Sequence, residues 1–363
     1  MTTVLHYIQQ WLPITEQFVH AHVTRSRHRA VVVSRLPFDN LDAFPHRPRH
    51  ALAPVLRRTP DRLDHLVTSA LVAGAALAHR AAVVHVHFGY RLNDVAGAAG
   101  RLHRPLVVSL HGHDATAYPI AHPGHYRGNL ERADRVIVPS EFLAARAVAL
   151  GARDDAIAIV PAGVDTAWFS PSPLPDGPPT AVFVGRLTEK KGIDVLLAAW
   201  PRIAAAVPGG QLRVLGDGPL AAAVRSTGAG VSLVAPEPDR RAAQVRDVLR
   251  SARVVVSPSR TPADGDAESL LLVNLEAQAS GRPVVTTRHG GIPEFVADGE
   301  TAILVREDDA AELADAVVTL LSDGDAAARM GAAGPAVAAR FAITTSVARI
   351  DAVYDELVEG LRR

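Results

Sequence analysis

The sequence predicts an α/β protein made of two Rossmann-like, doubly wound domains in series. Short β-branched runs alternate with longer helical patterns along the whole chain, one proline-rich stretch interrupts the alternation, and 363 residues are enough for two domains. Continuous β-branched runs are typical of strands buried on both faces, and helices between them imply a parallel sheet. We expect the two domains to face a central cleft, because open α/β sheets bind ligands beyond the carboxyl ends of their strands.

In the first half of the chain, helical patterns at 63–80 and 141–152 separate the expected strands. These strands cover residues 3–8, 30–34, 83–87, 105–110, 135–139 and 157–161. The pattern stops at 169–180, where five of the twelve residues are proline, and this composition predicts a linker.

In the second half, the expected strands cover residues 180–185, 211–216, 231–235, 253–259, 282–287 and 301–305. The predicted domains are therefore 1–172 and 180–341. A last helix at 342–363 follows, and we expect it to pack back on the N-terminal domain. Apolar residues recur along one face of this helix, at Val347, Ile350, Val353, Tyr354 and Leu357.

The charges balance over the whole chain, with 38 basic and 38 acidic residues, so no basic excess points to nucleic acid. Residues 1–175 carry 18 Arg against 13 acids, and the remainder carries the opposite excess. The basic first half suits an anionic acceptor or a lipid surface, or it reflects two domains with different surfaces.

Cysteine is absent, which excludes disulfides and thiolate metal sites. The first residues lack the pattern of a signal peptide, and the longest apolar stretch, 66–78, is too short to span a bilayer. We therefore expect a cytoplasmic enzyme, with room for weak peripheral contact at the inner membrane face through the N-terminal domain.

The two lysines of the chain stand side by side, Lys190 and Lys191, in the expected loop between a strand and a helix. Cations are unfavourable at a helix N-terminus, where the dipole and the free N–H groups attract anions. Together with Arg186, the lysines suggest a phosphate site, since Arg binds phosphate bidentately and Lys as a point charge. A solvated basic loop is the alternative.

A second candidate segment is 268–280, which the pattern predicts to be a helix. Glu268 would lie near its N-cap and Glu276 about 2.2 turns later on the same face, roughly 12 Å away along the axis. Glu268 alone could be a cap. Glu276 is expected in an apolar context and therefore needs partners, which ligand hydroxyls would supply. The N–H groups around Ser269, Leu270 and Leu271 could meet a phosphate.

These segments, with "VLGDGPL", "TRHGGIPEFVADGETAILV", "VHVHFG", "SLHGHD" and "IVPAGVDTAWF", resemble glycosyltransferase family 4, which has the GT-B fold. "LPITEQFV" resembles the opening segment of its polysaccharide-biosynthesis members. The resemblance implies a retaining, metal-independent transfer of a hexose-type sugar from a UDP-, GDP- or ADP-sugar. The acceptor would be a glycan, a lipid-linked saccharide or a small molecule, in envelope or exopolysaccharide synthesis or in secondary-metabolite glycosylation.

The resemblance also implies roles for the site residues. Arg186 and Lys191 would hold the donor diphosphate, with Lys190 as a bystander. Glu276 would bind the ribose hydroxyls. Glu268 and His111 would lie at the donor sugar, and the amides of residues 269–271 would complete the phosphate site. No further cofactor is implied.

Several features leave alternatives open. Leu271 stands where most relatives have Pro, and Ala235-Pro236 where many have Gly, so sugar and base stay undetermined. Thr15, before Glu16, is a helix cap or an acceptor contact. The pairs His85/His87 and His111/His113, with Asp114, are candidate metal ligands or acceptor contacts. We expect no metal.

Rival functions are a sugar phosphorylase or synthase on the same fold and a non-catalytic nucleotide-sugar-binding protein. An NAD-dependent dehydrogenase would also suit two Rossmann-like domains. However, no expected strand is followed by the Gly-rich dinucleotide fingerprint.

Overall fold

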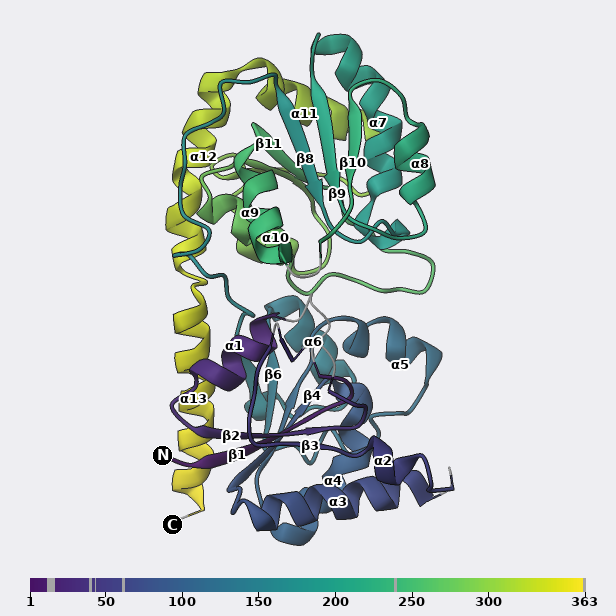
Figure 1. Cartoon of the computed structure of the whole chain (residues 1–363), viewed down its shortest axis with the longest axis vertical. Helices are drawn as coiled ribbons and strands as arrows, with labels where there is room; N and C mark the ends of the chain where they lie inside the picture. Colours follow the sequence, from purple (N-terminus) through teal and green to yellow (C-terminus); the bar gives the residue numbers. More distant parts are fainter. Residues whose placement is uncertain (12–16, 39–40, 43, 61–62, 238–239, 362–363) are drawn as a thin grey trace. The chain divides into compact units, whose positions relative to one another are not determined.

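The computed structural model describes residues 1–11, 17–38, 41–42, 44–60, 63–237 and 240–361. Within them the chain forms two compact units, each around its own parallel sheet (Figure 1). The first unit contains residues 1–162 and 343–363, and the second contains 163–342. Thr15 and Glu16, predicted as the start of a helix, lie outside the described residues.

The first unit contains a seven-stranded parallel sheet in the order β3-β2-β1-β4-β5-β6-β7. Its strands are β1 Thr3–Ile8, β2 Arg29–Ser34, β3 Arg49–Ala51, β4 Val83–His87, β5 Leu106–Ser109, β6 Arg135–Val138 and β7 Ile157–Ile159. Its helices are α1 Gln17–Arg25, α2 Ala53–Leu56, α3 Asp64–Ala78, α4 Leu92–Leu102, α5 Ala117–Ala121, α6 Glu141–Ala149 and α13 Ile343–Gly360.

The second unit contains a six-stranded parallel sheet in the order β10-β9-β8-β11-β12-β13. Its strands are β8 Thr180–Val184, β9 Gln211–Leu215, β10 Val231–Val234, β11 Val254–Ser257, β12 Val284–Thr287 and β13 Ala302–Val305. Its helices are α7 Ile193–Ala206, α8 Ala221–Ser226, α9 Arg241–Arg250, α10 Leu272–Ala279, α11 Ala310–Ser322 and α12 Gly324–Ala339.

Both sheets have the doubly wound order of a Rossmann fold, which confirms the predicted fold class of the two domains. The strand order reverses between β1 and β4 in the first unit and between β8 and β11 in the second. Ligands of such sheets bind beyond the carboxyl ends of the strands at this switch point. The central strands β4 and β11 are buried throughout, as their Val-rich sequences predicted.

The last helix, α13, packs on the first unit, and its apolar stripe is confirmed. Ile350, Val353 and Tyr354 are buried against β1 and β4, in a cluster that includes Val4 and Val83. Polar contacts add to this packing, because Ser26 donates a hydrogen bond to Asp351 (2.5 Å) and His22 bonds with Ser346 (2.8 Å).

The proline-rich stretch is not a free linker, and its prediction as one was wrong. Phe169 is buried in the core of the second unit. Arg282, itself 1% exposed, donates hydrogen bonds to the carbonyls of Ser172 (2.7 Å) and Pro173 (2.8 Å). The prolines lack N–H donors, but their carbonyls still accept bonds, so a buried arginine holds the stretch. The first boundary between the units therefore lies after Ala162.

Among the described residues, no helix combines the length and the apolar character needed to cross a membrane.

Candidate functional site

The loop from β8 to α7 lies at the switch point of the second sheet, next to the end of β11. A one-turn helix, η6 Glu189–Lys191, precedes Gly192, which has φ +64° and begins α7. A Cβ atom at Gly192 would lie 1.8 Å from the carbonyl oxygen of Pro258, so only glycine lets the two loops meet. The two segments singled out in the sequence therefore come together here.

Lys191 and Glu268 form a buried ion pair, with Lys191 Nζ 2.6 Å from Glu268 Oε1. Burial lowers the pKa of Lys191, and the carboxylate offsets only part of this effect. Burial alone would raise the pKa of Glu268, but the ammonium groups of Lys191 and Lys190 hold it below 4.5. Glu268 is therefore charged near neutral pH.

Lys190 has contacts of its own beside this pair, and its expected role as a bystander to phosphate binding stays a prediction. Its side chain is 11% exposed, and Nζ lies 2.9 Å from Asp266 Oδ1 and 3.1 Å from the Ala267 carbonyl oxygen. Glu268 Oε2 lies 3.8 Å away. Lys190 thus joins η6 to the segment before α10.

Glu268 does not belong to a helix, because α10 begins only at Leu272. The Glu268 N–H donates to His289 Nε2 (3.0 Å), and its carbonyl accepts from the Gly291 N–H (2.9 Å). The bond from Gly291 occupies the Glu268 carbonyl, which the first turn of a helix would need as an acceptor. A Cβ at Gly290 would lie 2.1 Å from the Glu268 carbonyl oxygen, so the "HGG" turn packs directly on this residue. The predicted shared helix face of Glu268 and Glu276 is therefore wrong.

The segment of Ser269, Leu270 and Leu271 leads directly into α10, with Ser269 and Leu271 buried. Leu271 is the N-cap residue, so the first amides of α10 follow it. Glu276 lies in the second turn of α10, half-buried between the buried residues Leu275 and Ala277.

Arg186 is exposed in the loop after β8, and its charge contributes to lowering the pKa of Lys191. The "GDGPL" turn supports this loop. Leu187 N–H donates to the Asp217 carbonyl (2.8 Å), and a Cβ at Gly216 would lie 2.0 Å from the Gly185 carbonyl oxygen. The second unit thus brings Lys191 into contact with Glu268, and Arg186 lies in the same loop as Lys191. The roles expected for these residues stay predictions.

His289 and Glu307 are site residues that the sequence reasoning missed. His289 is 1% exposed, and since its Nε2 accepts from Glu268, its Nδ1–H donates to Glu307 Oε1 (3.0 Å). This relay fixes the backbone of Glu268. The available signal was that His289 is the one histidine beyond residue 175 and begins "HGGIPE".

His111 belongs to the first unit, after β5. Its backbone N–H donates to Asp114 Oδ1 (2.8 Å), and its ring contacts Phe88 and Phe18, with centroids 4.5 and 5.2 Å away. Burial lowers its pKa to about 3, so the imidazole is neutral and can exchange hydrogen bonds with a hydroxyl group.

His6, His85 and His87 gather at the switch point of the first sheet, with potential ligand nitrogens within 4.8 Å of one another. His85 Nδ1 bonds with the Tyr354 hydroxyl (2.6 Å) and Nε2 with Ser109 Oγ (2.7 Å), while the His85 and His87 rings stack at 4.1 Å. These contacts describe a network of hydrogen-bonded neutral imidazoles. The expected absence of a metal stays a prediction.

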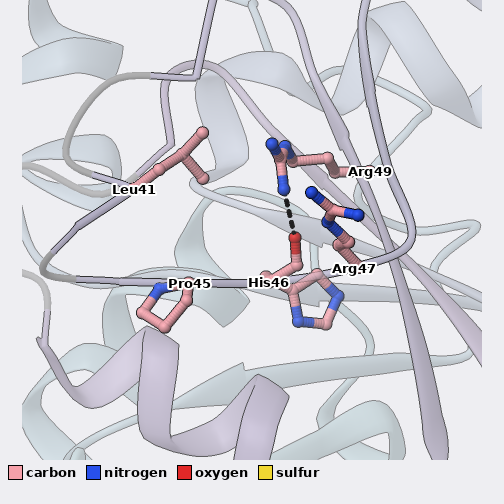
Figure 2. Close-up of a pocket in the computed structure, with 5 residues that line it drawn as sticks. All are labelled: Leu41, Pro45, His46, Arg47 and Arg49. Atoms are coloured by element: carbon pink, nitrogen blue, oxygen red, sulfur yellow. Dashed lines mark hydrogen bonds between the residues drawn. The ribbon is translucent and has the colours of Figure 1, made fainter.

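A pocket of about 420 Å³ lies in the first unit (Figure 2). It is lined by Leu41, Pro45, His46, Arg47 and Arg49. Arg49 donates to the His46 carbonyl (2.8 Å), as Figure 2 shows, and Arg47 is exposed. Two guanidinium groups give this pocket the chemistry of an anion contact.

Two family models match the chain, "Glycosyltransferase Family 4" over residues 19–168 and "Glycosyl transferases group 1" over 178–323. A putative colanic acid biosynthesis glycosyltransferase, WcaL of Escherichia coli, is 32% identical over 71% of this chain and 66% of its own length. A GDP-mannose-dependent α-(1-6)-phosphatidylinositol monomannoside mannosyltransferase of Mycolicibacterium smegmatis is 34% identical over 67% of each chain. The matches thus span about two thirds of these relatives.

Among solved structures, Anabaena Alr3699/HepE in complex with UDP and glucose has a TM-score of 0.79 and 20% identity. The similarity covers 98% of this chain and 100% of that one, and it supports the fold. With the two doubly wound sheets and the two family models, these similarities show that the chain belongs to glycosyltransferase family 4 and has the GT-B fold.

Proposed function

We propose that the protein is a retaining glycosyltransferase that moves a hexose-type sugar from a nucleoside diphosphate sugar to an acceptor hydroxyl. The observation that carries this proposal is the buried Lys191–Glu268 pair beside Arg186, at the switch point of the donor-type sheet. Lys191 and Arg186 stabilise the diphosphate as it leaves, and Glu268 contacts the hexose. Ser269, Leu270 and Leu271 direct backbone amides to the phosphates, and Glu276 binds the ribose.

The reaction retains the anomeric configuration, with the acceptor attacking from the face that the diphosphate leaves. The departing phosphate oxygen accepts the proton of the acceptor hydroxyl, so no side-chain base is needed. The protein contributes charge stabilisation and positioning. His111, a neutral imidazole of the first unit, can exchange hydrogen bonds with a sugar hydroxyl.

For the acceptor, the arginine-lined pocket of the first unit favours a molecule with an anionic group, such as a lipid-linked saccharide phosphate. The mannosyltransferase relative acts, by its name, on a phosphatidylinositol monomannoside, which carries a phosphate. We infer cytoplasmic activity with weak peripheral contact at an anionic lipid surface.

The proposal is tested by thermal unfolding of the purified protein with UDP, GDP, ADP and their glucose and mannose conjugates. Specific binding stabilises the native state, so we expect one nucleotide family to raise Tm. Product analysis then separates the alternatives, since release of a nucleoside diphosphate marks the transferase and use of a sugar phosphate marks a phosphorylase. No shift with any nucleotide would contradict the proposal.

Removing metal ions should leave the activity intact. Cationic side chains are available for the diphosphate charge that a divalent ion neutralises in other enzymes. Activity with the donor found in the screen is measured before and after EDTA treatment, with added Mg²⁺ as the control. Complete loss of activity, restored by the metal, would overturn metal independence.

Glu276→Ala should raise the donor KM by about 10- to 100-fold, which corresponds to losing hydrogen bonds from a charged group to the ribose. The matched control is Glu300→Ala, at an exposed turn of the same unit, which should leave KM unchanged. Steady-state kinetics at varied donor concentration decide the matter. An unchanged KM in Glu276→Ala would remove this residue from the ribose site.

A further inference from the structure

The two adjacent lysines have different surroundings although both approach the same carboxylate. Lys191 donates to Glu268 Oε1 at 2.6 Å, and among the described residues this is the acceptor of its ammonium group. Two of its three N–H bonds thus stay available for a ligand. Lys190 Nζ is instead held by Asp266 Oδ1, by the Ala267 carbonyl and, at 3.8 Å, by Glu268 Oε2.

The backbone on both sides of Lys190 is fixed as well. The Arg260 N–H donates to the Lys190 carbonyl (2.9 Å), and the Arg260 guanidinium pairs with Asp194 and Asp308 at 2.6 Å each. Gly192 packs on Pro258. Lys190 therefore has little freedom to turn toward a ligand, whereas its contacts determine where residues 266–268 lie.

Donor binding creates a problem for Glu268 that Lys190 solves. If the diphosphate draws the Lys191 ammonium away, a carboxylate that is 8% exposed loses its closest cation. A buried carboxylate without a cation is strongly disfavoured and would take up a proton or move. Lys190, already next to Glu268 Oε2 and anchored by Asp266, keeps the carboxylate charged and in place.

We propose that the twin lysines divide the work, with Lys191 binding the donor diphosphate and Lys190 acting as a positioning residue that holds Asp266–Glu268 while Lys191 is engaged. This inference rests on the proposed function and concerns the same site. It accounts for the lysine at position 190 in a chain that has 36 arginines, the 38 basic residues less the two lysines. A planar five-donor guanidinium matches the three-point contact of Lys190 less well than a compact ammonium.

Because the chain has two lysines, each can be observed separately by NMR. Protein labelled with ¹³C at lysine Cε should give two side-chain NMR signals, assigned with Lys190→Arg and Lys191→Arg. UDP, GDP and ADP are titrated in turn, followed by the glucose and mannose conjugates of the one that binds. We expect the nucleoside diphosphate to shift the Lys191 signal strongly and to leave the Lys190 signal nearly unchanged. A Lys190 shift as large as that of Lys191 would overturn the division of work.

The second readout compares the effects of a substitution on nucleotide affinity and on turnover. Lys190→Met should leave the affinity for the sugar-free nucleoside diphosphate within about threefold but lower kcat with the nucleotide sugar by more than about tenfold. Asp266→Asn, which keeps the shape of its partner, should show the same split, and the double variant should be no worse than Lys190→Met. Arg253→Met is the matched control, because Arg253 also donates to a carbonyl of this unit, that of Leu321 at 2.7 Å.

The outcomes separate the two proposals. If no nucleotide shifts either lysine signal, the proposed function fails, and the inference fails with it. If a nucleotide shifts the Lys191 signal, the proposed function stands. The positioning role of Lys190 is then overturned by either of two results for Lys190→Met: nucleotide affinity and turnover fall in parallel, or both stay unchanged. Thermal unfolding of each variant shows whether a parallel loss reflects unfolding, and Asp266→Asn then decides the positioning role.

Discussion

Acidification from about pH 7 to about pH 5 is expected to lower the free energy of unfolding by several kcal/mol, because the first unit buries neutral histidines. Burial lowers the pKa of His6, His22 and His111 from 6.5 to about 3. The pKa of His85 and His87 falls well below 6.5 for the same reason. In the unfolded chain these groups regain their ordinary pKa and take up protons first.

The sign and size of the pH effect on the free energy of unfolding follow from this difference in histidine pKa between the folded and the unfolded chain. Stability from a histidine with a depressed pKa is fully present above pH 6.5 and is lost as the pH falls toward the folded pKa near 3. Each such histidine costs about 1.4 kcal/mol per pH unit, so three of them cost about 6 kcal/mol at pH 5. This is comparable with the whole stability of a typical domain, about 5–15 kcal/mol. Asp114 acts in the opposite direction, since burial raises its pKa.

Urea unfolding at a series of pH values measures this dependence. His22→Gln removes one titrating group while keeping an amide that can donate to Ser346 or to the Ala162 carbonyl, the partners of His22. It should be less stable near neutral pH but lose about 1 kcal/mol less per pH unit than the wild type. His65→Gln, at an exposed site of α3, is the control. A wild-type free energy that stays flat from pH 7 to 5 would contradict the prediction.

The fold could be predicted from the sequence because buried parallel strands leave an unmistakable pattern. Short Val-rich runs such as 83–87 and 254–257 indicate buried parallel strands when helices separate them. The short strand β3, Arg49–Ala51, was missed since it has three residues and a polar composition at the edge of the sheet. The proline-rich stretch was misjudged because its partner, Arg282, lies more than 100 residues away.

The candidate site could be predicted only in part, because some of its contacts join residues that are far apart in the sequence. Charge in a strand-to-helix loop pointed to Arg186 and Lys191, and the structure places Lys191 in contact with Glu268. Local pattern could not show the contacts between distant parts of the chain, which pair Lys191 with Glu268 across 77 residues and Lys190 with Asp266. Helical periodicity continues through 268–271, but bonds to residues 289 and 291 outweigh it.

The histidines show a further limit of prediction from the sequence. Strand alternation predicted that His85 and His87 share a face, and their rings stack at 4.1 Å. It could not show that Tyr354, on the last helix, hydrogen-bonds with His85 across 269 residues. This contact connects α13 to the switch point of the first sheet.

The second large effect is expected from the buried pair itself, where opposite substitutions should have distinguishable consequences. Lys191→Met should weaken nucleoside diphosphate binding by about 100-fold or more, because a charge-assisted contact to the phosphates is lost at a largely buried site. The fold should tolerate this change better than most losses of a buried partner, since Lys190 remains beside Glu268. Calorimetric titration with the nucleotide identified in the thermal screen measures the affinity.

Glu268→Gln should have the opposite pattern, with nucleotide binding kept and turnover lost. The amide keeps the shape of the carboxylate, and the freed Lys191 ammonium gains a stronger attraction for the diphosphate, so nucleoside diphosphate affinity should stay the same or rise. Turnover should fall by about 100-fold or more, because the group proposed to contact the hexose no longer carries charge as the sugar–phosphate bond breaks. Arg202→Met, which removes an exposed pair with Asp315, serves as the control for charge changes in this unit. If Glu268→Gln instead loses nucleotide affinity while keeping turnover, the carboxylate acts only by holding Lys191 for the phosphate, and the sugar contact must be sought on another residue.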